Sequence, residues 1–421
     1  MLGAARHNTQ TYSLAVVITI SLCASWGMAH GFYGQIAAPF YRFFELSSMQ
    51  RVLASSSFGI TYVIVAIPAA LLLRKLGYQL VVVFGLSAFS VGAFLLYPAV
   101  AQHQVWFYVA TVIATSTGWC LLETSANPLI CSIGSPRTAV QRLNFAQALY
   151  PLGVVAAVYF SRGLAVPRAG MLDAHTVETL VHPYILVGLA VVLVAALIAN
   201  VQFPPVAEAR GHSTTKPRQE LRTLLLRREF QYALAAMCTT MIALVTVDIL
   251  AEKYVAHAWP AAPAQLLPNV SILFWTVVAI GRFSGAAVML RFDPLRVLAA
   301  AVTACVLVLC LAQFFQGFAG VACFFGTALF LSITFPTIFG EAIRNTGDLT
   351  KSASGLLVVA AGIGSLLGQR LVVWTLRADY LHLALTVTAL CCVVALVAAL
   401  AIRRLRTGIS AAPQDWTIAS V

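Results

Sequence analysis

Residues 203–229 read FPPVAEARGHSTTKPRQELRTLLLRRE, and this polar, basic stretch separates two sets of long apolar runs. A run of about 20 apolar residues is long enough to cross a bilayer as a helix, so each run predicts one transmembrane span. The spans before the stretch are 12–38, 52–73, 79–100, 105–133, 141–161 and 182–202. Those after it are 230–254, 268–290, 296–314, 317–341, 353–374 and 382–402.

This division predicts four parts in an all-α membrane protein. They are an N-terminal six-helix bundle (1–202), a linker (203–229), a C-terminal six-helix bundle (230–402) and a tail (403–421). The linker lacks an apolar core of its own, and we expect it to carry one short surface helix over Gln219–Arg228.

The composition excludes a soluble protein. Apolar residue types make up 60% of the 421 residues and charged types only 10%, against roughly 25% charged in soluble domains. The net charge of +12 does not indicate nucleic-acid binding, because the basic residues lie in short gaps between apolar runs. The nine cysteines lack metal-ligand spacing, so we expect free thiols and no metal site.

The basic residues also predict orientation. With the N-terminus inside, most of the 26 Lys and Arg fall in inner segments, as the positive-inside rule requires. Both termini and the linker are therefore predicted to be cytoplasmic, in the inner membrane of a bacterium. The first apolar run continues from about Tyr12 to Phe40, which is too long for a cleavable signal.

Glu123 is the clearest candidate for chemistry, because a carboxyl group inside a span is costly unless it faces a cavity or protein. Trp119, Glu123 and Asn127 are four residues apart and share a helix face, and Pro128 predicts a kink beside them. A carboxyl group away from water prefers its neutral form, which suits a proton carrier. The alternative is a protonated Glu that hydrogen-bonds between helices.

The next span adds amide side chains, which both donate and accept hydrogen bonds and so suit a hydroxyl-rich ligand. Gln147 is the candidate contact there, with Tyr150 nearby, whereas Asn144 lies nearer the cytoplasmic end and favours a packing or gating role. In the first span Trp26, His30 and Tyr33 share a face, and Gln35 is rotated about 140° from His30. His30 is either a titrating group or a neutral hydrogen-bonding residue.

The second set of spans carries fewer such groups. Asp248 and Glu252 lie one turn apart near the predicted outer end of the seventh span, where a solvated mouth is expected. Arg282 favours a gating or structural role, and Trp275 either stacks on a sugar face or packs in the core. Walker motifs and nucleophile–base signatures are missing from the sequence, so neither ATP-driven transport nor an enzyme is predicted, and no cofactor is expected.

Several stretches together resemble the fucose/galactose/proton symporter family of the major facilitator superfamily. They are Leu122–Pro128, Arg142–Gln147 and Phe335–Phe339, followed by Thr350-Lys351. The resemblance implies twelve helices, alternating access and sugar uptake coupled to protons. It places the proton-linked glutamate of the family on Glu123 and the sugar-contacting glutamine on Gln147. The first-helix Asp of the family falls instead on Gly34 or Gln35, so that carboxylate is absent.

We therefore expect a monomeric secondary transporter, embedded in membrane lipids, that imports a sugar or other small polar metabolite with protons. The candidate residues are Glu123 for the proton; Gln147, His30, Tyr33, Gln35, Trp119, Asn127, Tyr150 and Trp275 for the substrate; and Asn144, Arg282 and Pro128 for gating or structure. The alternatives are an importer or exporter of a siderophore, drug or other amphipathic metabolite, and a non-transporting receptor or sensor.

Overall fold

The computed structural model describes residues 2–161, 174–201, 216–377 and 380–409, and nearly all of them are helical. The first helices are α1 (Leu2–Phe43), α2 (Ser48–Ala101), α3 (Val105–Ser132), η1 (Pro136–Thr138), α4 (Ala139–Gln147), α5 (Leu149–Ser161) and α6 (Ala174–Ala199). Next come α8 (Pro217–Leu226), α9 (Arg228–Ala258), η2 (Leu267–Asn269), α10 (Val270–Val288) and α11 (Pro294–Phe314). The last are α12 (Gly317–Leu331), α13 (Thr334–Ile343), η3 (Gly347–Leu349), α14 (Thr350–Arg377) and α15 (Leu381–Ile409).

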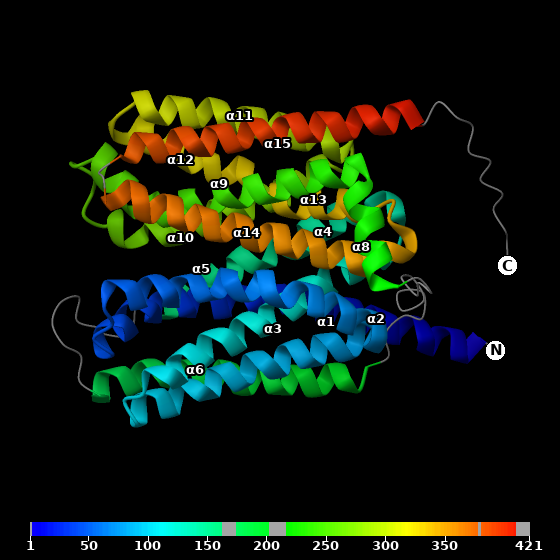
Figure 1. Cartoon of the computed structure of the whole chain (residues 1–421), viewed down its shortest axis with the longest axis horizontal. Coiled ribbons are helices and arrows are strands. Elements are labelled where there is room, and N and C mark those ends of the chain that lie inside the picture. Colours follow the sequence, from blue (N-terminus) through cyan, green and yellow to red (C-terminus); the bar gives the residue numbers. More distant parts are fainter. Residues whose placement is uncertain (1, 162–173, 202–215, 378–379, 410–421) are drawn as a thin grey trace.

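Helix α2 contains two membrane crossings. It has 54 residues, which at about 1.5 Å per residue is far longer than the apolar thickness of a bilayer. Its helical geometry breaks at Gly77, where φ is 78°, and the chain turns back there (Figure 1). Glycine is favoured at such a left-handed angle because it has no Cβ. The second and third predicted spans are therefore the two arms of α2.

The fifth and tenth predicted spans each consist of two helices, α4–α5 and α12–α13. The second helix of each pair carries a proline in its first turn, Pro151 and Pro336. Proline has no N–H, so the carbonyl oxygen four residues earlier loses its helical partner. These carbonyls belong to Gln147 and Ser332, which lie at the two breaks.

The helices form two groups that lie side by side (Figure 1). The first group contains α1, α2, α3 and α6, and the second contains α9, α11, α12, α14 and α15. Between them, α5 packs on both α1 and α10, and α4 packs on α10 and α13. Because α4 and α5 come from the first half of the chain and α10 and α13 from the second, these contacts join the two halves.

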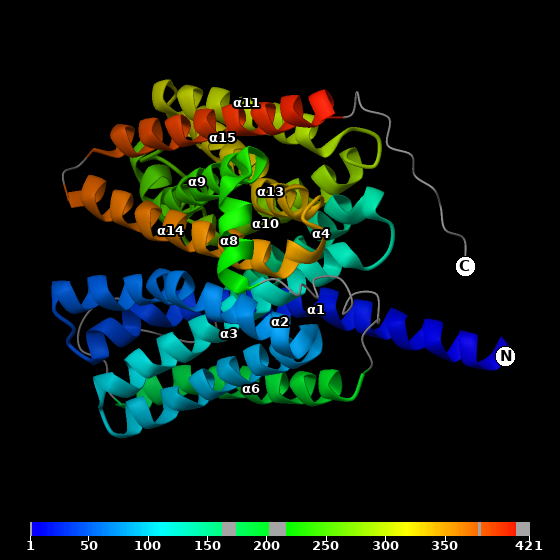
Figure 2. The same cartoon turned by 45° about the vertical axis from the view of Figure 1, so that its right-hand side comes forward.

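The start of α1, the helix α8 and the end of α15 lie at one end of the molecule, which we call the linker end (Figures 1 and 2). Helix α8 is the predicted surface helix, but its Glu220 and Leu224 are buried. The Glu220 carboxylate pairs with Arg74 of α2 at 3.0 Å and accepts a hydrogen bond from Ser352 of α14 at 2.5 Å. The linker therefore contacts both groups of helices.

The predicted boundaries of the tail and the linker differ from the helix ends or lie outside the described residues. The predicted tail begins inside a helix, because α15 continues to Ile409, and residues 410–421 lie outside the described part of the chain. Most of the predicted linker before α8, residues 202–215, also lies outside it.

Candidate functional site

A cavity of about 500 Å³ lies between the two groups of helices, a size typical of small-molecule sites. Its wall follows α9 from Met241 to Ile249 and α14 from Ala361 to Gln369. Both segments are in the parts of these helices farther from the linker end, so the cavity extends from the middle of the molecule toward the opposite end.

Most of the site residues predicted from the sequence line this cavity. These are Glu123, Gln147, His30, Tyr33, Trp119, Tyr150, Trp275 and Arg282. Gln35 is exposed and is not among the lining residues, while Asn127, Asn144 and Pro128 are buried outside the lining. The cavity therefore brings together predicted residues from five different helices, and His30 and Arg282 are 252 positions apart in the chain.

The Glu123 side chain projects from α3 into the cavity and is half-buried there. The hydroxyl group of Tyr62, on α2, is close enough to hydrogen-bond with its carboxyl group. Arg282 of α10 lies within range of a favourable charge interaction with the same carboxyl group. Glu123 thus has a hydroxyl partner from its own half of the chain and a cation from the other half.

The Arg282 guanidinium is held by the two carbonyl groups that prolines leave without helical partners. Its Nη1 donates to the Gln147 carbonyl at 2.6 Å, and its Nε donates to the Ser332 carbonyl at 3.0 Å. Pro151 and Pro336 provide these two acceptors, one at the α4–α5 break and one at the α12–α13 break. Because Arg282 is only 4% exposed, these two hydrogen bonds help a charged group to be tolerated between the helices.

Aromatic rings form one side of the cavity. The Tyr150 hydroxyl hydrogen-bonds to His30 Nδ1 at 2.5 Å, and the two rings stack with centroids 5.7 Å apart. Trp119 and Trp275 meet the His30 ring edge-on, at 5.9 and 5.6 Å. The Arg282 guanidinium carbon lies 5.8 Å from the Tyr150 ring centroid. Stacked rings of this kind suit the apolar face of a sugar or an organic cation.

Gln147 is oriented by a residue behind the cavity wall. Its Nε2 donates to Asn127 Oδ1 at 2.7 Å, and its Oε1 lies 3.4 Å from Arg282 Nη1. Asn127 was predicted as a substrate contact, but in the structure it is buried and contacts Gln147 instead. The Asn127 amide, one turn after Glu123 on α3, therefore holds the Gln147 side chain in place.

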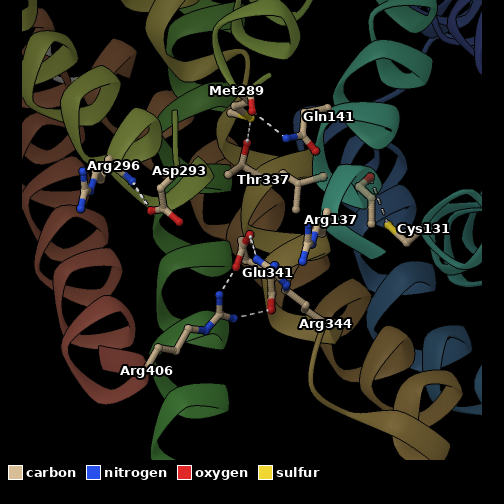
Figure 3. A network of polar contacts seen from close by, with 12 residues as sticks. Cys131, Arg137, Gln141, Met289, Asp293, Arg296, Thr337, Glu341, Arg344 and Arg406 are labelled. Atoms are coloured by element: carbon tan, nitrogen blue, oxygen red, sulfur yellow. Dashed lines mark hydrogen bonds and ion pairs between the residues drawn. The ribbon is translucent and has the colours of Figure 1, made fainter. Parts of the chain in front are cut away.

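The linker end of the interface is closed by direct hydrogen bonds between the two halves of the chain. Asn144 Nδ2 donates to Thr337 Oγ1 at 3.1 Å. Gln141 Nε2 donates to the Met289 carbonyl at 2.6 Å (Figure 3). Ser354 Oγ donates to the Thr124 carbonyl at 2.7 Å. That carbonyl is four residues before Pro128, so it too has lost its helical partner.

A family model for the Major Facilitator Superfamily matches residues 11–369. The chain belongs to this superfamily. The L-fucose-proton symporter of Escherichia coli (strain K12) is 28% identical over 370 residues, which cover 83% of this chain and 84% of that protein. The glucose/galactose transporter of Brucella abortus biovar 1 (strain 9-941) is 27% identical over 357 residues, with 83% and 85% covered.

Solved structures agree with this assignment. The chain is similar to the superfamily transporter FucP in its outward conformation, with a TM-score of 0.82, 26% identity and coverage of 93% of this chain and 99% of that chain. The proton:xylose symporter XylE has a TM-score of 0.70 at 14% identity, covering 93% and 96%, and shows the fold alone. The predicted twelve-helix major facilitator fold is confirmed.

Sequence reasoning missed some lining residues of this major facilitator chain. Asp248 was predicted at a solvated mouth, yet it lines the cavity, while Glu252 one turn farther along α9 is exposed. The signal was present, because Met241, Val245 and Asp248 recur at helical spacing on one face. Tyr62 and Gln141 lacked any such signal, because their roles depend on which helices become neighbours.

Proposed function

We propose that this chain imports a sugar or another small polar metabolite together with protons, by alternating access, across the cytoplasmic membrane of a bacterium. The observation that carries the proposal is the carboxyl group of Glu123, which faces a cavity between the two halves of the chain. On the linker side of this cavity, short hydrogen bonds of Gln141, Asn144 and Ser354 join the halves. The named activities of the similar symporter and sugar transporter support it.

The orientation predicted from the basic residues places the linker end, and with it both termini, in the cytoplasm. The cavity then faces the outside, where both substrate and protons would enter. Glu123 would take up the proton, because a carboxyl group in a membrane cavity is tolerated in its neutral form. Gln147 and the ring cluster of His30, Tyr150 and Trp275 would contact the substrate.

Import would then require the seal at the linker end to open. The bonds that close it join neutral side chains and carbonyl groups, each worth about 1 kcal/mol net. Because the whole set is worth only a few kcal/mol, the energy of binding a substrate and a proton is large enough to offset it.

The test is uptake by the purified protein in liposomes, over a panel of neutral sugars, amino sugars and siderophores, with and without an acidic outside. We expect at least one solute to accumulate only under the gradient. Glu123→Gln should abolish accumulation, because an amide cannot carry the proton, while Glu45→Gln, at an exposed position, should not. Accumulation that ignores the gradient, or that survives in Glu123→Gln, would remove the proton-coupling claim, and gradient-driven efflux would reverse the direction.

A further inference from the structure

The cavity lining holds two carboxyl groups but one permanent cation. Its carboxylates are Glu123 and Asp248, on opposite halves of the chain, and its permanent cation is Arg282. An unbalanced charge in the membrane interior is expensive, so the groups that balance each carboxylate decide what the cavity can bind.

Arg282 is directed to Glu123 and not to Asp248. Its Nε and Nη1 are occupied by the Ser332 and Gln147 carbonyls, which hold the guanidinium in place. The charged neighbour that acts on Glu123 is Arg282, whereas the one that acts on Asp248 is Glu252, which repels it. Within the described part of the chain, no ion pair joins Asp248 to a basic side chain.

Asp248 lines the same cavity as the aromatic rings. It lies within interaction range of Tyr150, whose ring stacks on His30 and meets Trp275 edge-on with centroids 5.7 Å apart. A cation placed beside Asp248 would therefore lie near aromatic rings, which attract positive charge through their faces. Carboxylate and aromatic groups together are the usual surroundings of a bound ammonium group.

The lining also offers a hydrogen-bond acceptor on the neighbouring helix α14. Nearby, Gln369 lines the cavity and its buried Oε1 is without a hydrogen-bond partner in the described residues, which leaves an acceptor for a further donor of the ligand.

We propose that Asp248 binds the ammonium group of a positively charged, amine-bearing substrate, and that the transported solute is an amino sugar. The proposal rests on the proposed function, because it names the substrate class of the same cavity. It accounts for a carboxyl group without a basic partner among the described residues, for the aromatic rings of the same cavity and for a volume of about 500 Å³, which accommodates a monosaccharide.

The experiment compares matched pairs of sugars that differ only by an amine, namely glucosamine with glucose and galactosamine with galactose. Binding is followed by tryptophan fluorescence of the purified protein, since Trp26, Trp119 and Trp275 line the cavity, and uptake is measured in liposomes. We expect the amino sugar of at least one pair to bind about tenfold or more tightly than its neutral partner, as a charged hydrogen bond implies.

The variant Asp248→Asn should reduce that preference about tenfold or more, because it should weaken amino-sugar binding much more than binding of the neutral sugar. Asp348→Asn, an exposed carboxylate at the linker end, is the matched control and should keep the preference. The proposal is overturned if neutral sugars bind as well as their amino partners, if Asp248→Asn weakens both alike, or if no amino sugar binds at all.

The two proposals fail in different ways. If amino sugars bind through Asp248 but their uptake ignores the proton gradient, proton coupling fails and the substrate class stands. If a neutral sugar accumulates under the gradient and Asp248→Asn leaves it unaffected, the transport function stands and the substrate class fails.

Discussion

At the linker end the two halves of the chain are joined by short hydrogen bonds, whereas farther from it they meet around the cavity and through the packing of α2 on α14. The bonds at the linker end are 2.6–3.1 Å long. Beyond the cavity, the contacts from Arg370 to the Val52 carbonyl and the Ser55 hydroxyl are both 3.4 Å. A transporter that alternates between two openings must break one set of contacts while making another. In this structure the shorter hydrogen bonds are those at the linker end.

A second contrast lies between contacts within one half and contacts between halves. The buried carboxylate of Glu341 pairs with Arg344 at 3.4 Å and with Arg406, so it ties α13 to α15 inside the second half (Figure 3). The contacts that close the linker end between the halves use neutral amides, hydroxyls and carbonyls. An ion-pair network thus stabilises the second half, and weaker neutral bonds close the linker end of the interface.

The largest expected effect concerns the ion pairs of Glu341 within the second half. Glu341→Ala leaves two arginines without their buried partner, so the free energy of unfolding should fall by about 3 kcal/mol. Unfolding in mixed micelles with increasing SDS measures it, with Asp348→Asn as the exposed control. A loss below about 1 kcal/mol would mean that the network does not stabilise the second half.

Arg282→Lys is next, because it alters the shortest charged hydrogen bond between the halves without removing the charge. A lysine ammonium cannot reproduce the guanidinium fork that reaches both the Gln147 and Ser332 carbonyls. Uptake should fall about 100-fold, which corresponds to the loss of one or two charged hydrogen bonds. Arg291→Lys, at an exposed position, is the control. Wild-type uptake by Arg282→Lys would show that the two carbonyls are not needed to hold the cation.

Asn144→Ala should weaken the seal at the linker end by removing its bond to Thr337. Val140 lies against Gly340 across the same interface, so Val140→Cys in a background without the nine native cysteines reports its opening. Labelling of that thiol by a maleimide should become about tenfold faster in Asn144→Ala, since one buried bond is worth about 1.4 kcal/mol. An unchanged rate would place the barrier to opening elsewhere.

The sequence predicted the spans and much of the cavity lining because both depend on local pattern. Glu123 stands out as a carboxyl group in an apolar run, and Gln147 as an amide at helical spacing. Helix length and apolar period also predicted the order of spans, but not the breaks at Gln147 and Ser332, where hydrophobicity continues without interruption.

Other features could not be predicted because they depend on tertiary neighbours. Pro128, Pro151 and Pro336 each predict an unsatisfied carbonyl, but not its new partner. The partners, Ser354 and Arg282, are between 50 and 230 residues away in the chain. Asp248 was assigned to the mouth for the same reason, because the sequence does not show how deep the cavity extends along α9.

The smallest expected effect tests whether such a carbonyl is part of the seal. Pro128→Ala restores an amide N–H to α3, so the Thr124 carbonyl regains a helical donor and competes less well for the Ser354 hydroxyl. Labelling of Val140→Cys should become only about twofold to threefold faster, because the carbonyl is shared and not lost.

Ser354→Ala removes the same hydrogen bond from the other side and should have a similar or slightly larger effect on labelling. If both substitutions act through that one bond, the double variant should match the larger single variant and not the product of the two. Multiplicative effects would mean that Pro128 acts by bending α3 and not by releasing the Thr124 carbonyl. The hydrogen bonds that close the linker end would then be those of the Gln141 and Asn144 side chains alone.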